Sequence, residues 1–506
     1  MTARIAKSIL HSTLLTPGRQ QVVSKSSWQI RQLLCSEGFV RKMATRKSVD
    51  TRVSFKTGEP PTSKIPVSVR KSFNSQTNKD VDTTDSLQLA KAIFFGGLEN
   101  VKPEKLIKSK VRLEGSILKL ENEEETSIDL SQYEKKYIVG FGKACLPMAE
   151  NLLLLLQGKI NRCVVSVPVD FRQSRNADIE VYPGGEHNIP DEASLIAATE
   201  IVDVAKSCTN KDLLIVLITG GGSALLPMPI PPVTLDEKQE LIKHLAKAGC
   251  TINELNTVRK RLSLVKGGGL VRLCNAKKIV SLIISDVAGN PLDIIASGTT
   301  VEDVDPPDAA LKILEKFNLD EELPPSINEV LRKLPPAISH FKFDHVTNFI
   351  IGDNRLALEA AAATAANYGI HPIIVTTTMS GEASEVGYDM ASLAEAIAYC
   401  ITHKEADNSN VKAYMDTITR IFKHNKWPLS GTMSEILQIN EMPVKGVCLL
   451  FGGETTVTVR GNGIGGRNQE LILSAGTRLD ISRNLPHVKN KVAILSAGSD
   501  GIDGFK

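Results

Sequence analysis

Asp212-Leu-Leu-Ile-Val-Leu-Ile-Thr219-Gly220-Gly-Gly-Ser223 joins a fully apolar run to a triple-glycine turn. An apolar run that enters such a turn is typical of a buried parallel strand and the start of its crossover connection. Two later runs, 279–284 and 348–352, have the same character and carry Asp286 and Asp353 just beyond their ends. Apolar strands that alternate with helical patterns predict an α/β fold with mostly parallel sheets.

The length of 506 residues is sufficient for two domains. Proline pairs at 306–307, 324–325 and 335–336 indicate loops and place a boundary near residue 340. We therefore expect an N-terminal α/β domain over residues 85–340, which begins with a capped helix, and a second α/β domain over residues 345–506.

The first residues differ in composition from the rest of the chain. Residues 1–56 hold eleven Lys and Arg against two acids, and no acid precedes Glu37. Basic and apolar residues interleave without a long apolar core, which matches a mitochondrial transit peptide over 1–43 better than a secretory signal. A disordered basic arm is the alternative, and Met43 would be a second start for a cytoplasmic form. Residues 44–84 are polar and are expected to form a disordered linker.

Composition excludes several classes of protein. The net charge of +3 becomes −6 once residues 1–56 are set aside, so we expect no nucleic-acid partner. The longest apolar runs have strand length, far short of the roughly 18 residues that a membrane span needs. Eight scattered cysteines without a C-x-x-C spacing indicate reduced thiols. The sequence gives no oligomeric state.

A second glycine-rich stretch follows the apolar run 446–451. It reads Gly452-Gly-Glu454, then the β-branched alternation 455–459, then Gly461-Asn-Gly-Ile-Gly-Gly-Arg467 before a helical pattern. Glycine turns that lead into helices present backbone N–H groups to an anion. The spacing also satisfies G-x-G-x-x-G, a weak dinucleotide signal, but the next acid, Asp480, follows no intervening strand.

Cations and acids accompany these turns. Lys143 follows a predicted strand and suits a transferring phosphoryl group, although a solvated lysine is an equal alternative on position alone. Arg467 lies at a helix N-terminus, where a cation needs an anionic partner: a ligand, or a carboxylate such as Glu454. The strand-tip acids Asp286, Asp353 and Asp500 suit Mg²⁺ or a general base, and each alone is also a common N-cap. These residues predict an enzyme acting on a phosphate-bearing or carboxylate substrate.

Eight motifs together resemble the type-2 glycerate kinases, from about residue 85 to the end. They are Val139-Gly-Phe-Gly-Lys143-Ala, Leu217-Ile-Thr-Gly-Gly-Gly-Ser223, Glu254-Leu-Asn256-Thr-Val-Arg259, Lys266-Gly-Gly-Gly, Ser285-Asp286-Val-Ala-Gly, Ala296-Ser-Gly298-Thr, Gly452-Gly-Glu454-Thr-Thr and Gly465-Gly-Arg467-Asn-Gln-Glu. The resemblance implies an N-terminal Rossmann-like domain, a C-terminal α/β domain and a cleft between them. It further implies phosphorylation of D-glycerate by ATP with Mg²⁺, with 2-phosphoglycerate favoured, in serine and fructose breakdown.

The resemblance also assigns roles to individual residues. Lys143 and Arg467 would be catalytic cations, and Asp286 would serve the substrate hydroxyl or the metal. The remaining candidates would bind nucleotide or substrate: Gly220, Gly221, Gly222, Ser223, Asn256, Lys266, Asp353, Glu454 and Asp500.

One departure from the family leaves alternatives open. Family members continue beyond the Asp500 segment, so we expect the C-terminal domain to be incomplete, with an unpaired sheet edge. An inactive, truncated binding form is therefore one alternative. An NAD(P)-dependent hydroxypyruvate reductase that uses the glycine loop for a dinucleotide is another.

Overall fold

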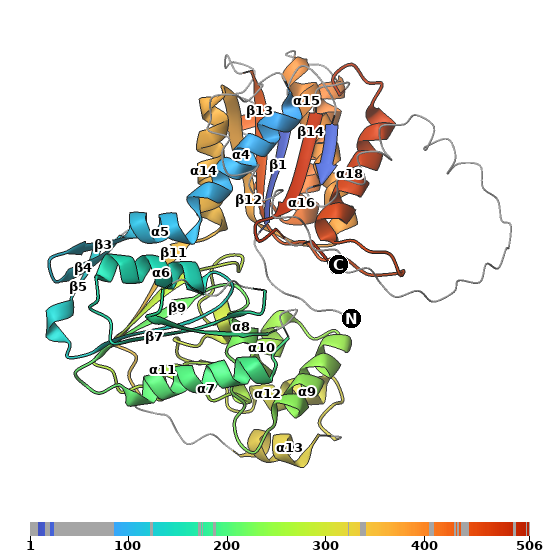
Figure 1. Ribbon diagram of the computed structural model, residues 1–506. Coiled ribbons are helices and arrows are strands. Elements are labelled where there is room, and N and C mark those ends of the chain that lie inside the picture. Colours follow the sequence, from blue (N-terminus) through green and yellow to red (C-terminus); the bar gives the residue numbers. More distant parts are fainter. Residues whose placement is uncertain are drawn as a thin grey trace, which may run out of the picture.

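The computed structural model describes residues 9–15, 21–24 and 85–504, with gaps at 122–124, 171–173, 175, 186–188, 322, 334–340, 404–408, 430–431, 433–434, 437–444, 489–491 and 502. Most of the predicted transit peptide and all of the predicted linker lie outside the described residues. The chain forms two lobes, each built around its own sheet (Figure 1).

The first lobe contains a six-stranded sheet of order β11-β10-β9-β6-β7-β8. Its strands are β6 (Lys136–Phe141), β7 (Arg162–Pro168), β8 (Ile179–Gly184), β9 (Leu213–Ile218), β10 (Lys278–Ile284) and β11 (Val346–Gly352). All pairings within this sheet are parallel. Every side chain of β9 is buried, as its unbroken apolar sequence predicts for a strand covered on both faces.

Helices cover both faces of this sheet, which gives the Rossmann-like layering that was expected. On one face lie α5 (Pro103–Lys110), α6 (Cys145–Leu156) and a small antiparallel sheet of β3 (Val111–Glu114), β4 (Ile117–Glu121) and β5 (Glu125–Asp129). On the other lie α7 (Glu192–Ser207), α8 (Gly222–Leu225) and α11 (Gly269–Arg272). Alternate residues of β9 face the two layers: Ile215 lies in the first and Val216 in the second.

A helical subdomain extends from the first lobe and has its own apolar core. It comprises α9 (Leu235–Lys247), α10 (Ile252–Arg261), α12 (Ala309–Lys316) and α13 (Pro325–Arg332). Thr234 and Thr251 begin α9 and α10 with reciprocal capping boxes, in which Glu237 and Glu254 return the hydrogen bond. The second of these helices carries part of the site described below.

The second lobe contains a five-stranded sheet of order β12-β13-β1-β14-β2. Its strands are β1 (Ile9–Leu15), β2 (Gln21–Ser24), β12 (Ile370–Met379), β13 (Gly446–Gly453) and β14 (Val492–Gly498). One face packs against α15 (Ala383–Thr402), α16 (Ser409–Asn425) and α18 (Arg467–Ser482). The other packs against α4 (Ser86–Asn100) and α14 (Asn354–Asn367).

The N-terminal segment takes part in this second sheet. β1 pairs antiparallel with both β13 and β14, and β2 pairs parallel with the outer side of β14. The sequence analysis predicted no element in residues 1–43. The last strand, β14, has a partner on each side, and the described strands at the two edges of this sheet are β12 and β2.

The structure places two elements in a different lobe from the one that the sequence suggested. β11, expected to open the second domain, pairs with β10 and forms an edge of the first sheet. The helix at residue 86, expected to open the first domain, is α4, and its apolar residues Leu89, Ile93 and Phe94 pack against the second sheet. The chain therefore crosses between the lobes both before α5 and after β11, and this double connection ties them together (Figure 1).

The polarity of residues 403–445 indicates an irregular insertion, but part of this segment is helical. The helix α16 spans Ser409–Asn425, and its buried Ile418, Ile421 and Phe422 pack into the core of the second lobe. Because the remaining face of α16 is polar, the sequence of this segment did not indicate a helix. Among the described residues, no helix is both long and apolar enough to cross a bilayer.

Candidate active site

Three polar turns meet at the carboxyl edge of the first sheet. β6, β9 and β10 are neighbours, and Lys143, the Gly220–Ser223 turn and Asp286 follow their ends. The Lys143 amide donates a hydrogen bond to the Gly220 carbonyl at 2.9 Å. A Cβ added to Gly220 would lie 2.2 Å from Asp286 Oδ2, so this carboxylate rests directly on the glycine turn. Parallel topology thus brings three predicted site segments together at the edge where open α/β sheets bind ligands.

The backbone before Lys143 is fixed by a second glycine. Gly142 has a φ of 135°, and a Cβ there would lie 2.2 Å from Thr219 Oγ1. The Ala144 amide donates to the same Thr219 hydroxyl at 3.0 Å. Any side chain at 142 would force the two turns apart, so the sequence Gly142-Lys143 is required for the lysine to lie beside the Gly220–Ser223 turn.

Lys143 also connects the two lobes. Its Nζ lies 3.2 Å from Asp500 Oδ2, and both side chains are about one-fifth exposed. Asp500 follows β14, the strand that β1 and β2 flank in the second sheet. Two residues that sequence analysis proposed separately, 357 positions apart, are therefore in direct contact.

Arg467 has the carboxylate partner that its position required. Its Nη1 forms an ion pair with Glu454 Oε1, between the start of α18 and the turn after β13. The buried Arg467 Nε has no hydrogen-bond partner among the described residues. A donor left unsatisfied in this way is costly, and a ligand oxygen would satisfy it.

Asp503 is a site residue that the sequence analysis missed. Its carboxylate accepts hydrogen bonds from the Asn468 and Gln469 amides, both at 3.0 Å, and from Asn468 Nδ2 at 2.9 Å. It therefore caps α18 and offsets the unfavourable placement of Arg467 at the positive end of the helix. The spacing Asp500-Gly-Ile-Asp503 was visible, but a capping carboxylate 35 residues after Asn468, whose amide it binds, has no local signal.

The glycine loop before Arg467 is not the strand–turn–helix unit of a dinucleotide site. β13 ends at Gly453, and residues 455–459 form no strand; Thr456 makes one isolated bridge to Glu382. Gly461 and Gly463 are exposed, and a Cβ on either would meet nothing within 4 Å. The β-branched alternation of 455–459 favours a strand, but within the described residues this segment pairs with no strand and makes only that bridge.

Asp353 caps a helix, which was the structural alternative to a role in ligand binding. It is the N-cap of α14 and accepts from the Leu356 amide at 2.9 Å, while its other oxygen accepts from Asn290 Nδ2 at 2.6 Å. Asn290 lies in the loop that begins at Asp286. The Asp353 carboxylate thus fixes this loop relative to α14.

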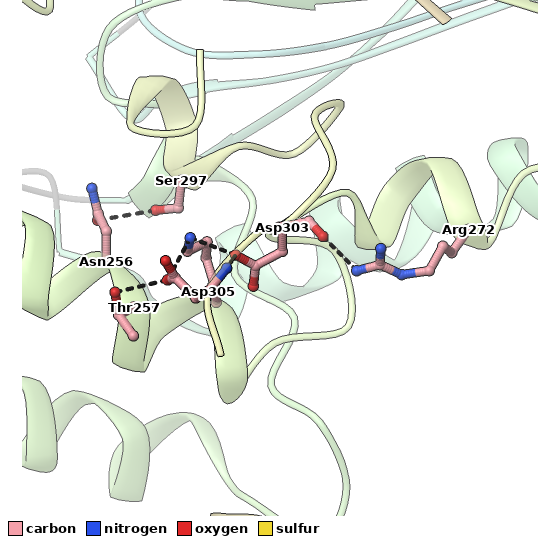
Figure 2. A network of polar contacts seen from close by, with 8 residues as sticks. Asn256, Thr257, Arg272, Ser297, Asp303 and Asp305 are labelled. Atoms are coloured by element: carbon pink, nitrogen blue, oxygen red, sulfur yellow. Dashed lines mark hydrogen bonds and ion pairs between the residues drawn. The ribbon is translucent and has the colours of Figure 1, made fainter. Parts of the chain in front are cut away.

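Ser223, Asn256 and Lys266 meet on the other side of the Gly220–Ser223 turn. The buried Lys266 donates from Nζ to the Ser223 carbonyl at 3.1 Å, and Ser223 Oγ lies 3.0 Å from Ser297 Oγ. Ser297 in turn donates to Asn256 Oδ1 at 3.2 Å (Figure 2). Burial, together with the nearby Arg259 guanidinium, lowers the pKa of the Lys266 ammonium to about 7.

A neighbouring ion-pair network holds α10 in place. Lys260, almost fully buried, contacts Asp303 at 2.6 Å and Asp305 at 2.7 Å, and Thr257 Oγ1 donates to Asp305 at 2.8 Å (Figure 2). Because both carboxylates are satisfied within this network, we regard it as support for the loop between β10 and α12. It positions Asn256, one turn earlier on the same helix.

The acids present suit Mg²⁺ held jointly with phosphate oxygens. No group of three or more His, Cys, Asp or Glu side chains forms a metal cage within the described part of the chain. Mg²⁺ is usually held by one or two carboxylates together with substrate phosphates and water. Asp500, which pairs with Lys143, and Asp286, which lies against Gly220, provide carboxylates of this kind.

The fold and the site together define a two-lobed α/β protein with lysine, arginine and acid side chains gathered between its sheets. Two family models match the chain: a domain of unknown function, DUF4147, over residues 89–332, and the MOFRL family over residues 447–506. The first match contains strands β6 to β10 of the first sheet and most of α4, but not β11; the second contains only β13 and β14 of the second sheet.

Similar proteins and a similar crystal structure identify the family more closely. The chain is 37% identical over 438 residues to a glycerate kinase of Danio rerio, covering 82% of this chain and 84% of the relative. It is 33% identical to a D-glycerate 2-kinase of Thermotoga maritima, covering 73% and 76%. The crystal structure of a glycerate kinase from Thermotoga maritima superposes with a TM-score of 0.62 at 30% identity, covering 83% and 84%.

The chain belongs to the glycerate kinase family. It is therefore an enzyme of the kinase class, and the reductase alternative is not favoured by these relatives. The contacts described here show which predicted residues lie together. The chemical role of each remains a prediction.

Proposed function

We propose that this protein transfers the terminal phosphoryl group of ATP to D-glycerate, with 2-phosphoglycerate as the product. The observation that carries the proposal is the contact of Lys143 with both lobes: its amide bonds to Gly220 and its ammonium pairs with Asp500. A kinase needs cations where charge spreads over the transferred group, in a cleft that positions both substrates. The glycerate kinases among the relatives support the substrate, and the D-glycerate 2-kinase supports the position of transfer.

Each residue has a distinct task in this scheme. Lys143 and Arg467 neutralise the transferred phosphoryl group from opposite lobes. Asp286 accepts the proton of the attacking hydroxyl, or holds Mg²⁺ with Asp500. Mg²⁺, held by these carboxylates, would reduce the negative charge of the phosphate groups. Glu454 keeps Arg467 oriented until substrate arrives.

The cellular setting is part of the same proposal. The basic N-terminal composition supports a mitochondrial location, with a cytoplasmic form from Met43 as the alternative. A product of this kind would carry carbon from serine and fructose breakdown towards glycolysis.

The test is ADP release from Mg-ATP that depends on D-glycerate, with product identity read by coupling to enolase. Immediate conversion by enolase supports 2-phosphoglycerate; conversion only after phosphoglycerate mutase is added would show the 3-phosphate instead. Hydroxypyruvate with NADH or NADPH tests the reductase. Absence of all turnover would favour an inactive binding form.

Two substitutions test the assignment of the cations. Lys143→Ala and Arg467→Ala should each lower kcat about 10²- to 10³-fold, as for loss of a group that stabilises transition-state charge. Lys211→Ala is the matched control, because Lys211 lies before β9 at the opposite edge of the sheet and forms an ion pair there with the exposed Glu134. Near-wild-type turnover in both variants would reject the assignment.

A further inference from the structure

A connected set of polar residues lies beside the Gly220–Ser223 turn, and we name it the Ser297 cluster: Ser223, Asn256, Arg259, Lys266 and Ser297. The contacts of Ser223, Lys266 and Ser297 are given above. Arg259 Nη1 completes the set by donating to Asn256 Oδ1 at 3.2 Å. The Asn256 amide oxygen thus accepts from both Ser297 and Arg259.

The cluster carries positive charge without acids to balance it. Within the described residues, neither Arg259 nor Lys266 has a carboxylate at ion-pair distance. A third cation lies behind them: the buried Lys238, whose Nζ donates to the Arg259 carbonyl at 3.3 Å and the Leu262 carbonyl at 2.8 Å. Lys260, next to Arg259 on α10, provides the contrast because it has two carboxylate partners.

The pKa values of Lys238, Arg259 and Lys266 agree with cations that lack acidic partners. Burial lowers the pKa values of Lys238, Arg259 and Lys266, and the repulsion that Arg259 exerts adds to the effect on both lysines. Buried cations without acids are expensive unless an anion joins them.

The backbone under the cluster is strained. Ala296 has a φ of 49° and Ser297 a φ of 60°, both in the left-handed region that residues other than glycine rarely adopt. Ser297 is fully buried in this conformation, with its hydroxyl between Ser223 and Asn256. Strain of this kind persists where the surrounding structure imposes it, and it gathers at ligand-binding sites.

Exposure differs within the cluster. Asn256, Lys266 and Ser297 are buried, whereas Ser223 and Arg259 are partly exposed. An oxyanion that enters from solvent would therefore meet Ser223 and Arg259 before Lys266.

We propose that the Ser297 cluster binds the carboxylate of glycerate, with Arg259 and Lys266 as its charge partners. This inference rests on the proposed function. Asp286 lies against Gly220 at the start of the turn, and Lys266 bonds to Ser223 at its end. A three-carbon acid whose carboxylate occupies the cluster would thus present a hydroxyl towards Asp286. Phosphate shares the same chemistry, so the nucleotide is the competing source of the anion.

The first experiment compares steady-state constants for the two substrates. In Arg259→Met and Lys266→Met, KM for D-glycerate should rise about 10- to 100-fold, as for loss of one charge-assisted hydrogen bond. KM for ATP should stay within about twofold. Arg259→Lys should recover part of the loss. The matched control is Arg261→Met, since Arg261 on the same helix donates to the Val330 carbonyl of α13 and should leave both constants unchanged.

A second comparison removes the carboxylate from the substrate. Glycerol keeps the hydroxyls and lacks the acid, so wild-type protein should strongly prefer D-glycerate by kcat/KM. This preference should fall about 10-fold or more in the Lys266→Met variant. If Lys266→Met fails to fold, Ser297→Ala replaces it. This variant loses only a hydroxyl, so the preference for D-glycerate over glycerol should fall by a smaller factor.

Other outcomes overturn the inference. A raised KM for ATP with an unchanged KM for D-glycerate would assign the cluster to nucleotide phosphate. Unchanged constants for both would remove any ligand role. If wild-type protein shows no glycerate-dependent ADP release, the proposed function fails. Calorimetric titration of D-glycerate without ATP then decides the carboxylate site, which requires binding in wild type and its loss in Lys266→Met or Ser297→Ala.

Discussion

Gly220→Ala should impair catalysis through Asp286 while leaving the fold intact. The added methyl group would lie 2.2 Å from Asp286 Oδ2 and 2.8 Å from its Cγ. An ordinary contact between carbon and oxygen is at least about 3.2 Å, so the carboxylate must move by about 1 Å. Gly220 does not have a positive φ, so alanine adds no backbone strain. A displacement of about 1 Å at a reacting group costs on the order of 10²-fold in rate.

The assay is kcat for D-glycerate and Mg-ATP in a cycle of Gly220→Ala, Asp286→Ala and the double variant. In the Asp286→Ala background the new methyl group meets only the side-chain Cβ at 3.5 Å, an ordinary contact. Gly220→Ala should therefore lower kcat and the melting temperature in wild type and change neither further when Asp286 is absent. Equal losses in both backgrounds, or full activity in the single variant, would refute the claim that Gly220 acts by making room for Asp286.

Three more predictions concern stability. Asp503→Ala removes the cap of α18 and should lower the free energy of unfolding by about 1–2 kcal/mol in denaturant titration; an unchanged midpoint would contradict the capping role. Lys266 keeps its proton up to about pH 10.5 in the unfolded chain but loses it near pH 7 when folded, so the free energy of unfolding should rise with pH between these values. Lys266→Met should flatten this slope, and an identical slope in both proteins would assign it to other groups. Deletion of residues 1–24 removes β1, which pairs along seven residues on each side, and should lower the melting temperature by roughly 10 °C. An unchanged melting temperature would show that the strand is dispensable, as removal of a transit peptide requires.

The first sheet was predictable because each of its strands carries its own signal. An unbroken apolar run such as β9 needs burial on both faces, and a glycine turn with a polar residue beyond it fixes the carboxyl edge. Once the strands are parallel, Lys143, Gly220 and Asp286 must lie at one edge. Side-chain chemistry at strand ends was therefore accessible without a structure.

The assignment of elements to lobes was not predictable in the same way. α4 and β11 have ordinary amphipathic and apolar patterns that would suit either sheet. The lobe that each element joins depends on the surface against which it packs. α4 packs against Leu450 and Leu495 of the second sheet, and β11 pairs with β10 of the first. Order along the chain favoured the wrong lobe in both cases, because adjacency in sequence says nothing about a chain that crosses between lobes twice.

The same limit explains which site residues were missed. Ser297 contacts Asn256, 41 residues earlier, and Asp503 caps the N-terminus of α18, so neither contact leaves a local signal in the sequence. Arg259 bonds to Asn256 on its own helix, but its missing acidic partner becomes visible only in the folded structure. The structure shows which cations have acidic partners. Lys260 contacts two carboxylates, whereas Arg259, one residue earlier, has no carboxylate at ion-pair distance within the described residues. Two adjacent cations on one helix thus differ in charge balance because of what the β10–α12 loop and the Gly220–Ser223 turn place opposite them. Under the proposed function, the cation without an acidic partner beside the Gly220–Ser223 turn is where the carboxylate of the substrate would supply the missing charge.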